Sequence, residues 1–334
     1  MLTMVPIYLL SGFLGSGKTT LLQHMIAQAQ AAGLTPAVLM NELGEVNLDG
    51  QLVSREVAMA EVLGGCICCS MRGDLSLELN QLLQQYKPDL VIVESTGAAH
   101  SMESIDAITE TSMYKHAVLQ EVITVVDSEH LLARSRSSKD KTFRLMQDQI
   151  RCASLLILNK CDRLYPEQIV ELEQLVRQWN THAQLVTASH CELNDWSWLL
   201  QPESTSNVVA EQAEKQNEDA VHDANGDKGH HEHVHGHNDQ HHEHVMSYTH
   251  YWKQSPHSEQ FEAWLQQLPP NIYRAKGIVT FRDVPSRFLF QFAYRESDFM
   301  RIEPQGDVHD VAVFIGEHFD AGWLKQELEK LEQQ

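Results

Sequence analysis

The sequence of 334 residues lacks any apolar run near the ~20 residues that a membrane-spanning helix needs. It has no positive charge before Lys18, so its N-terminus does not resemble a secretory signal. No internal repeat is visible either. These absences lead us to expect a cytoplasmic protein that has no membrane partner.

Basic residues are scarce: 25 Lys and Arg stand against 46 Asp and Glu, a formal net charge of −21. Non-specific nucleic-acid binding relies on cationic contacts to phosphate, so this balance argues against a nucleic-acid partner. An acidic surface otherwise indicates only solubility. Apolar residues make up 43% of the chain, which is enough for a sizeable core.

Cysteines are few as well, and three of the six stand together as Cys66, Cys68 and Cys69. This spacing is poor for a disulfide framework and typical of a metal or redox site. A reducing compartment would keep the cysteines as thiols.

Short apolar runs alternate with helical stretches through residues 1–200, which predicts an α/β domain with a mostly parallel sheet. The runs are continuously apolar, so we expect helices on both faces of the sheet. The expected strands are Val5–Leu10, Ala37–Met40, Leu90–Val93, Val122–Val126, Leu155–Leu158 and Leu185–Thr187. The expected helices are Lys18–Ala32, Leu75–Gln85 and Glu167–Trp179.

The composition changes after Gln201. Residues 203–244 have almost no large apolar side chains and many acids and histidines, which predicts a mobile linker. Residues 245–334 are expected to form a small α+β domain. Its strands are predicted at Arg274–Phe281, Arg287–Tyr294 and Val311–Ile315, and its helices at Glu259–Leu268 and Ala321–Leu331.

The segment Gly12–Thr19 matches the P-loop pattern between an expected strand and an expected helix. Its glycines let backbone N–H groups surround the β-phosphate, and the helix N-terminus adds a positive dipole end. Lys18 is predicted to reach the β- and γ-phosphates and Thr19 to bind Mg²⁺. The predicted phosphate-binding residues are Gly12, Gly15, Ser16, Gly17, Lys18, Thr19 and Thr20.

Carboxylates follow two of the strands. Glu94 ends an apolar strand and suits the role of holding Mg²⁺, through water, while Gly97 resembles the glycine whose N–H senses a γ-phosphate. Glu42, after the second strand, is a candidate acid near metal or attacking water; an exposed loop acid is an equally good interpretation. The predicted catalytic residues are Lys18, Glu42 and Glu94.

A base-reading motif follows the strand Leu155–Leu158, with Asn159, Lys160 and Asp162 as the predicted contacts. The Asp162 carboxylate can accept hydrogen bonds from the guanine ring N–H and the exocyclic amine. Adenine offers no such pair, and leaving the acid unsatisfied costs about 1–3 kcal/mol. The sequence therefore predicts GTP rather than ATP.

The thiols of Cys66, Cys68 and Cys69 lie in the region that acts as a switch in P-loop proteins. Three thiolates on one turn can converge on a tetrahedral ion, and soft ligands favour zinc or Cu(I) over hard ions. A redox pair or ordinary buried cysteines are the alternatives. Because these thiols sit beside a switch, we favour a zinc site.

Histidines crowd the segment 203–244, where we predict weak metal binding by His230, His231, His233, His235 and His237. A solvated linker without function is the alternative. Outside this tract, His24, His116 and His182 are interpreted as surface helix residues, and Cys152, Cys161 and Cys191 as packing residues.

Taken together, Gly12–Thr20, Asn41–Glu45, Gly65–Cys69, Glu94–Gly97 and Asn159–Asp162 resemble the CobW-type GTPases, which include the zinc-regulated metallochaperones. The C-terminal segment from Arg274 to Gly316 is similar to that family's C-terminal domain. The resemblance implies a GTPase whose thiol motif binds metal and GTP together, and a C-terminal domain that helps to engage a client metalloprotein.

The sequence thus favours a slow GTPase that uses GTP and Mg²⁺ and couples hydrolysis to the delivery of Zn²⁺, with Co²⁺ or Ni²⁺ possible. A nickel or cobalt insertase and a GTP-gated metal buffer or sensor are the alternatives. The client and the oligomeric state are left open by the sequence.

Overall fold

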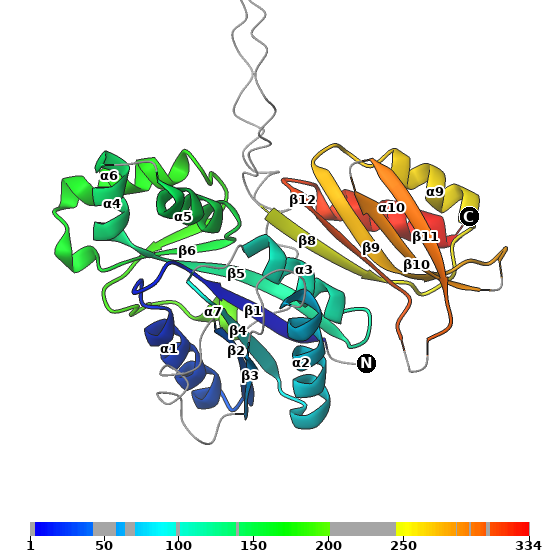
Figure 1. Ribbon diagram of the computed structural model, residues 1–334, viewed down its shortest axis with the longest axis horizontal. Helices are drawn as coiled ribbons and strands as arrows, with labels where there is room; N and C mark the ends of the chain where they lie inside the picture. Colours follow the sequence, from blue (N-terminus) through cyan, green and yellow to red (C-terminus); the bar gives the residue numbers. More distant parts are fainter. Residues whose placement is uncertain are drawn as a thin grey trace, which may run out of the picture.

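The computed structural model describes residues 4–42, 58–63, 71–97, 101–137, 140–200, 245–284, 286–293, 295–304 and 308–333. These residues form two sheets with their helices (Figure 1). None of the helices in these ranges is long and apolar enough to cross a membrane.

The first sheet has seven strands in the order β3-β2-β4-β1-β5-β6-β7, and all neighbours pair in parallel. The strands are β1 (Val5–Ser11), β2 (Pro36–Glu42), β3 (Ala58–Leu63), β4 (Leu90–Ser95), β5 (Ala117–Asp127), β6 (Leu155–Asn159) and β7 (Gln184–Thr187). The predicted α/β fold with a parallel sheet is confirmed.

Helices cover both faces of this sheet, as the continuous apolar runs predicted. Consecutive residues of β1 show why: Ile7 and Leu9 pack in one core, Tyr8 and Leu10 in another, and all four are fully buried. One face is covered by α1 (Lys18–Ala31) and α7 (Ser197–Leu200). The other carries α2 (Met71–Tyr86), α3 (Ser101–Thr111), α4 (Ser128–Ser137), α5 (Lys141–Arg151) and α6 (Pro166–Arg177).

The second sheet is antiparallel, with strand order β11-β10-β9-β12-β8. Its strands are β8 (Val245–Tyr251), β9 (Ile272–Thr280), β10 (Arg287–Ala293), β11 (Glu296–Ile302) and β12 (Val311–Glu317). One face packs on α9 (Ser258–Gln266) and α10 (Ala321–Gln333). This is the small α+β domain that the sequence predicted, with two more strands, β8 and β11, than were expected.

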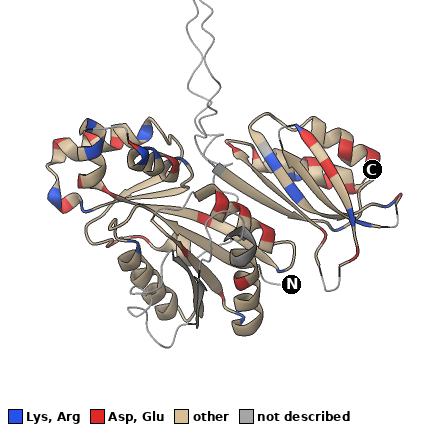
Figure 2. Ribbon diagram, viewed as in Figure 1, with Lys and Arg blue, Asp and Glu red and all other residues tan. Residues whose placement is uncertain are grey.

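The other face of the second sheet packs against the first domain. Ile278, Val311 and Val313 belong to the same buried core as Ile105 and Ile108 of α3. Figure 1 shows β8, β9 and β12 beside α3. In Figure 2 the Lys, Arg, Asp and Glu residues lie mainly on the helices and on the strands of the second sheet. Apolar burial therefore joins the two domains along α3.

Polar contacts reinforce this seam. Arg274 of β9 pairs with the buried carboxylate of Asp106 on α3, and Lys276 Nζ donates to the Asp106 carbonyl at 2.6 Å. The Tyr251 hydroxyl lies 3.1 Å from the Lys115 carbonyl, and burial raises the pKa of Tyr251 to about 12. The second sheet thus binds α3 and the turn that follows it through an ion pair and hydrogen bonds.

Two of the isolated histidines are not helical, so their interpretation as surface helix residues was wrong. His116 precedes β5 and its ring centroid lies 4.0 Å from that of His309. His182 precedes β7 and lies 3.7 Å from His318, again centroid to centroid. Both pairs cross the seam. His24 is on α1, with Nδ1 2.9 Å from the Cys191 carbonyl.

Candidate nucleotide site

The loop between β1 and α1 is built from glycines with positive φ. The values are 140° at Gly12, 76° at Gly15 and 114° at Gly17, a region that L side chains rarely adopt. Space adds a second restriction at two of them. A Cβ on Gly12 would lie 2.3 Å from the Val125 carbonyl oxygen, and one on Gly17 would lie 2.5 Å from Asn159 Nδ2. The backbone therefore curls tightly and can aim its N–H groups at an anion.

Lys18 begins α1 and is 92% buried, its side chain folded back over this loop. The Nζ atom donates to the Gly12 carbonyl at 2.9 Å. Thr19 and Thr20, in the same first turn, are half-buried. A cation and the N-terminus of a helix thus meet at one loop, which is suited to a phosphate group. All seven residues that the sequence assigned to phosphate lie in this loop or in the first turn of α1.

Glu94 and Gly97 reach the same loop from β4. Glu94 is buried and pairs in register with Leu10, just before the loop. A Cβ on Gly97 would lie 2.7 Å from the Leu14 backbone nitrogen, so Gly97 packs directly on the P-loop. The structure therefore brings both residues to the predicted phosphate site.

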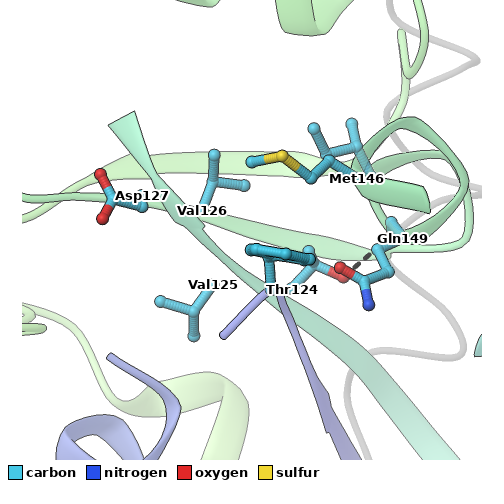
Figure 3. A pocket seen from close by; sticks show the side chains of 8 residues that line it. Thr124, Val125, Val126, Asp127, Met146 and Gln149 are labelled. Carbon is cyan, nitrogen blue, oxygen red and sulfur yellow. Dashed lines mark hydrogen bonds between the residues drawn. The ribbon is translucent and has the colours of Figure 1, made fainter. Parts of the chain in front are cut away.

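Hydrogen bonds in a small pocket beside the P-loop hold Gly97 in this position. It lies between Phe13, the end of β5 and α5 (Figure 3). Within it the buried Gln149 donates from Nε2 to the Gly97 carbonyl at 3.2 Å. The Thr124 hydroxyl donates to the Gln149 carbonyl at 2.9 Å. Strand β5 and helix α5 thus set the position of Gly97, and the sequence did not signal Gln149.

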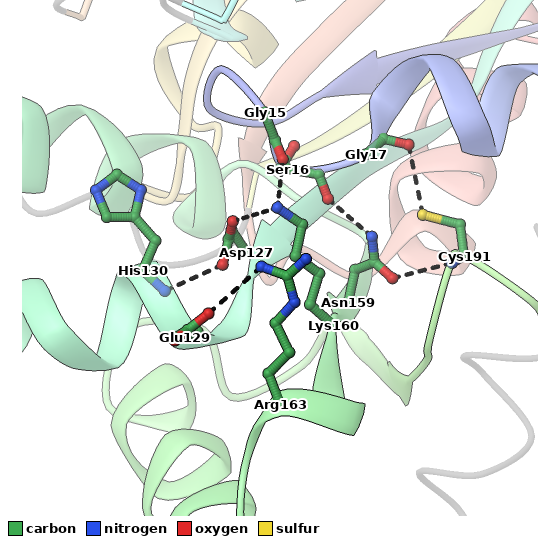
Figure 4. A network of polar contacts seen from close by, with 10 residues as sticks. All are labelled: Gly15, Ser16, Gly17, Asp127, Glu129, His130, Asn159, Lys160, Arg163 and Cys191. Carbon is green, nitrogen blue, oxygen red and sulfur yellow. Dashed lines mark hydrogen bonds and ion pairs between the residues drawn. The ribbon is translucent and has the colours of Figure 1, made fainter.

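The base-reading motif is tied to the P-loop by Asn159, at the end of β6. Asn159 Nδ2 donates to the Ser16 carbonyl at 2.8 Å, and Oδ1 accepts from the Cys191 N–H at 2.9 Å. Figure 4 shows these contacts in one network with Lys160, whose Nζ donates to the Gly15 carbonyl at 2.7 Å. Asp162 lies in the short helix η2 (Cys161–Arg163), with its side chain exposed.

Cys191 has a larger part in this network than the packing role that the sequence suggested. Besides its backbone contact with Asn159, its thiol donates to the Gly17 carbonyl at 3.4 Å. Burial raises the pKa of the Cys191 thiol to about 12, although a backbone hydrogen bond from Leu21 and the Lys160 charge lower it. The thiol is therefore neutral near pH 7 and serves as a weak hydrogen-bond donor.

The predicted zinc ligands and the weakly metal-binding histidines lie outside the described residues. This holds for Cys66, Cys68 and Cys69, in the chain between β3 and α2, and for His230, His231, His233, His235 and His237. Glu42 is the last residue of β2, beside the end of β4, and only its backbone is described. Among the described residues, no group of three or more His, Cys, Asp and Glu side chains could hold a metal ion.

Comparison with known proteins gives two family matches. Residues 6–187 match the CobW/HypB/UreG nucleotide-binding domain, and residues 245–332 match the cobalamin synthesis protein cobW C-terminal domain. The two matches correspond to the two sheets of the structure.

Individual relatives carry metal-related names. The chain is 36% identical to the zinc chaperone YeiR of Escherichia coli over 54% of each chain. It is 31% identical to zinc-regulated GTPase metalloprotein activator 1 of Dictyostelium discoideum, over 56% of this chain and 46% of that one. The chain thus spans about half the length of these two relatives. Identity to the zinc chaperone YjiA of E. coli is 28%, over 93% of this chain and 94% of that one.

Proposed function

Since the chain belongs to the CobW/HypB/UreG family of nucleotide-binding proteins, we propose that it is a cytoplasmic GTP-hydrolysing metallochaperone for zinc. One observation carries the proposal: the P-loop and the base-reading motif are joined into one site, in a chain with a Cys-x-Cys-Cys motif between β3 and α2. Relatives named as zinc chaperones favour zinc as the cargo.

In this proposal the phosphates lie on the loop from Gly12 to Gly17 and on the first turn of α1. The tightly curled backbone and the buried Lys18 ammonium fit a polyphosphate. A Mg²⁺ ion would be held by the Thr19 hydroxyl and, through water, by Glu94, and would neutralise charge between the β- and γ-phosphates. We assign Glu42 and Glu94 as the candidate carboxylates at the reacting phosphate. The sequence offers no obvious strong general base, so we expect slow intrinsic turnover.

Asp162 reads the base in this proposal, so Asp162→Asn should reduce the preference for GTP over ATP by roughly 5–150-fold, the equivalent of about 1–3 kcal/mol. The amide keeps one acceptor but places a donor against the exocyclic amine of guanine. The same donor would face a carbonyl in xanthine, so xanthosine triphosphate should gain affinity. Competition of the three triphosphates against a fluorescent GTP analogue measures these changes.

Glu167→Gln, on the exposed first turn of α6, is the matched control because it removes a nearby negative charge without touching the motif. It should leave the ranking of the nucleotides unchanged. If the Asp162→Asn protein keeps the selectivity of the natural protein for guanine, Asp162 is not the base reader.

Zinc would be bound as cargo by Cys66, Cys68 and Cys69, with the histidines of residues 203–244 as a weaker store. We assign residues 1–200 to nucleotide and metal binding and residues 245–334 to engaging a client. The contacts between the two domains support communication between these two parts of the chain. Helix α3 begins at Ser101, shortly after Gly97, and its Asp106 is gripped by Arg274 and Lys276. A displacement of Gly97 can therefore be transmitted through α3 to the second sheet.

The test is a pair of titrations: metal into protein with a GTP analogue, with GDP or without nucleotide, and the GTP analogue into protein with or without metal. We expect the GTP analogue to tighten zinc binding by roughly 5–150-fold, with metal tightening the analogue by the same factor. Running Zn²⁺, Co²⁺ and Ni²⁺ in parallel separates a zinc chaperone from a nickel or cobalt insertase.

Replacing Cys66, Cys68 and Cys69 together by Ser provides the matched control. It should remove the tight metal site and the coupling but leave basal GTP binding unchanged, because Lys18, Thr19 and Asp162 are retained. Equal zinc affinity in all nucleotide states would rule out coupled delivery. Coupling without any stimulation of hydrolysis by a client would instead favour a GTP-gated buffer or sensor.

A further inference from the structure

Asp127, the last residue of β5, uses both of its carboxylate oxygens, and no role was assigned to it from the sequence. Oδ1 accepts from the His130 N–H at 3.0 Å, which caps the first turn of α4. Oδ2 lies 2.6 Å from Lys160 Nζ, and the two side chains are 13% and 23% exposed. Figure 4 shows Asp127 and Lys160 facing each other across the end of the parallel sheet.

Lys160 is held at two points by this arrangement. Its Nζ atom donates to Asp127 and, at 2.7 Å, to the Gly15 carbonyl of the P-loop. Its backbone is left-handed, with φ 63°. Asp127 is in register with Asn159, the residue before Lys160. Three segments therefore meet at one ammonium group: the P-loop, the end of β5 and the base-reading motif.

The alternative is that Asp127 only caps α4 or adds an ordinary ion pair. A nearby pair gives the comparison: Glu129, also in the first turn of α4, lies 3.5 Å from Arg163 of η2. Both of those side chains are more than half exposed, so that pair contributes little. Asp127 and Lys160 are mostly shielded from water, and a flexible four-carbon side chain loses considerable rotamer freedom when it is held.

We propose that Asp127 is a positioning residue for nucleotide binding: it orients Lys160, and through it the Gly15 segment of the P-loop, before the nucleotide arrives. This inference rests on the proposed function and extends it to a residue outside the P-loop and the base-reading motif. Ordering Lys160 in advance lowers the entropic cost of binding. Because the contact exists before the reaction, it should stabilise the bound substrate and the bound transition state equally.

The test is Asp127→Asn, which retains an oxygen for the His130 N–H and so keeps the cap of α4, but removes the charge that faces Lys160. We expect the Kd for GTP and GDP to rise by about tenfold and KM to rise in parallel, with kcat within about twofold of the natural protein. Fluorescent nucleotide titration and steady-state hydrolysis give these values. Glu129→Gln, the exposed neighbour, should change neither Kd nor KM by more than about twofold.

A double-mutant cycle with Lys160→Met identifies the route. If Asp127 acts through Lys160, adding Asp127→Asn to Lys160→Met should cause little further loss of affinity. Independent, additive losses would overturn the proposal, as would a lower unfolding temperature with unchanged Kd, which is the signature of a purely structural cap. If the natural protein binds ATP more tightly than GTP, only the assignment of guanine as the base is refuted. The double-mutant cycle can then be measured with ATP instead of GTP. Absence of binding to either nucleotide would overturn both.

Discussion

Lys18→Ala should weaken GTP binding by at least about a hundredfold, which corresponds to ~3 kcal/mol. The Lys18 ammonium is a buried cation at the phosphate loop, where it donates to the Gly12 carbonyl. In the shielded site its attraction to the β- and γ-phosphates is screened far less than at the surface. Isothermal titration with a non-hydrolysable GTP analogue gives the affinity.

Lys325→Ala is the matched control, because it removes one positive charge from the exposed side of α10, in the other domain. It should leave the affinity for GTP unchanged. Thermal unfolding should show both variants folded, since the Lys18 side chain can be truncated without opening a strand or a helix. An affinity of the Lys18→Ala protein for GTP within a few-fold of that of the natural protein would contradict the P-loop assignment.

Gly97→Ala should reduce GTP hydrolysis by roughly a hundredfold while GDP affinity changes only a few-fold. A Cβ at Gly97 would lie 2.7 Å from the Leu14 nitrogen and 3.1 Å from its Cα, and neither backbone atom can move aside cheaply. The added methyl group must therefore push Gly97 away from the P-loop. GDP lacks the γ-phosphate that Gly97 is proposed to sense, so its binding should be spared. Single-turnover hydrolysis and GDP titration separate the two effects.

Gly33→Ala is the control that tests whether replacing any glycine by alanine reduces GTP hydrolysis. Gly33 follows α1 with φ 78°, so alanine there is strained, but nothing lies within 4 Å of its added Cβ. We expect lower stability and normal hydrolysis. If Gly97→Ala hydrolyses GTP at the natural rate, the switch role of Gly97 is wrong.

Hydrophobic patterning predicted the parallel sheet and six of its seven strands, and it missed the edge strand β3. Strands β4 and β6 are buried at every position, and their runs Leu90–Val93 and Leu155–Leu158 are apolar throughout, so they stand out from the flanking polar sequence. The helices α3, α4 and α5 were missed. Helix α5 buries Phe143, Met146 and Ile150, whose i, i+3 and i+7 spacing is that of one helix face, so its pattern was present in the sequence.

The sequence by itself determined the chemistry of the nucleotide site, because the P-loop is a local structure. Its glycines permit the positive φ values and its lysine follows at fixed spacing, so Gly12–Thr20 can be recognised without knowledge of the fold. The same reasoning marked Asn159, Lys160 and Asp162 by their place after an apolar strand.

Only the tertiary structure decided which distant residues complete that site. Asp127, Gln149 and Cys191 stand in unremarkable sequence, and each acquires a contact with the nucleotide loops through strand order and helix packing. The same holds for the ion pair between Arg274 and Asp106, which joins the two domains. Hydrogen bonds and ion pairs between residues far apart in the chain depend on folded distances, which no local pattern encodes.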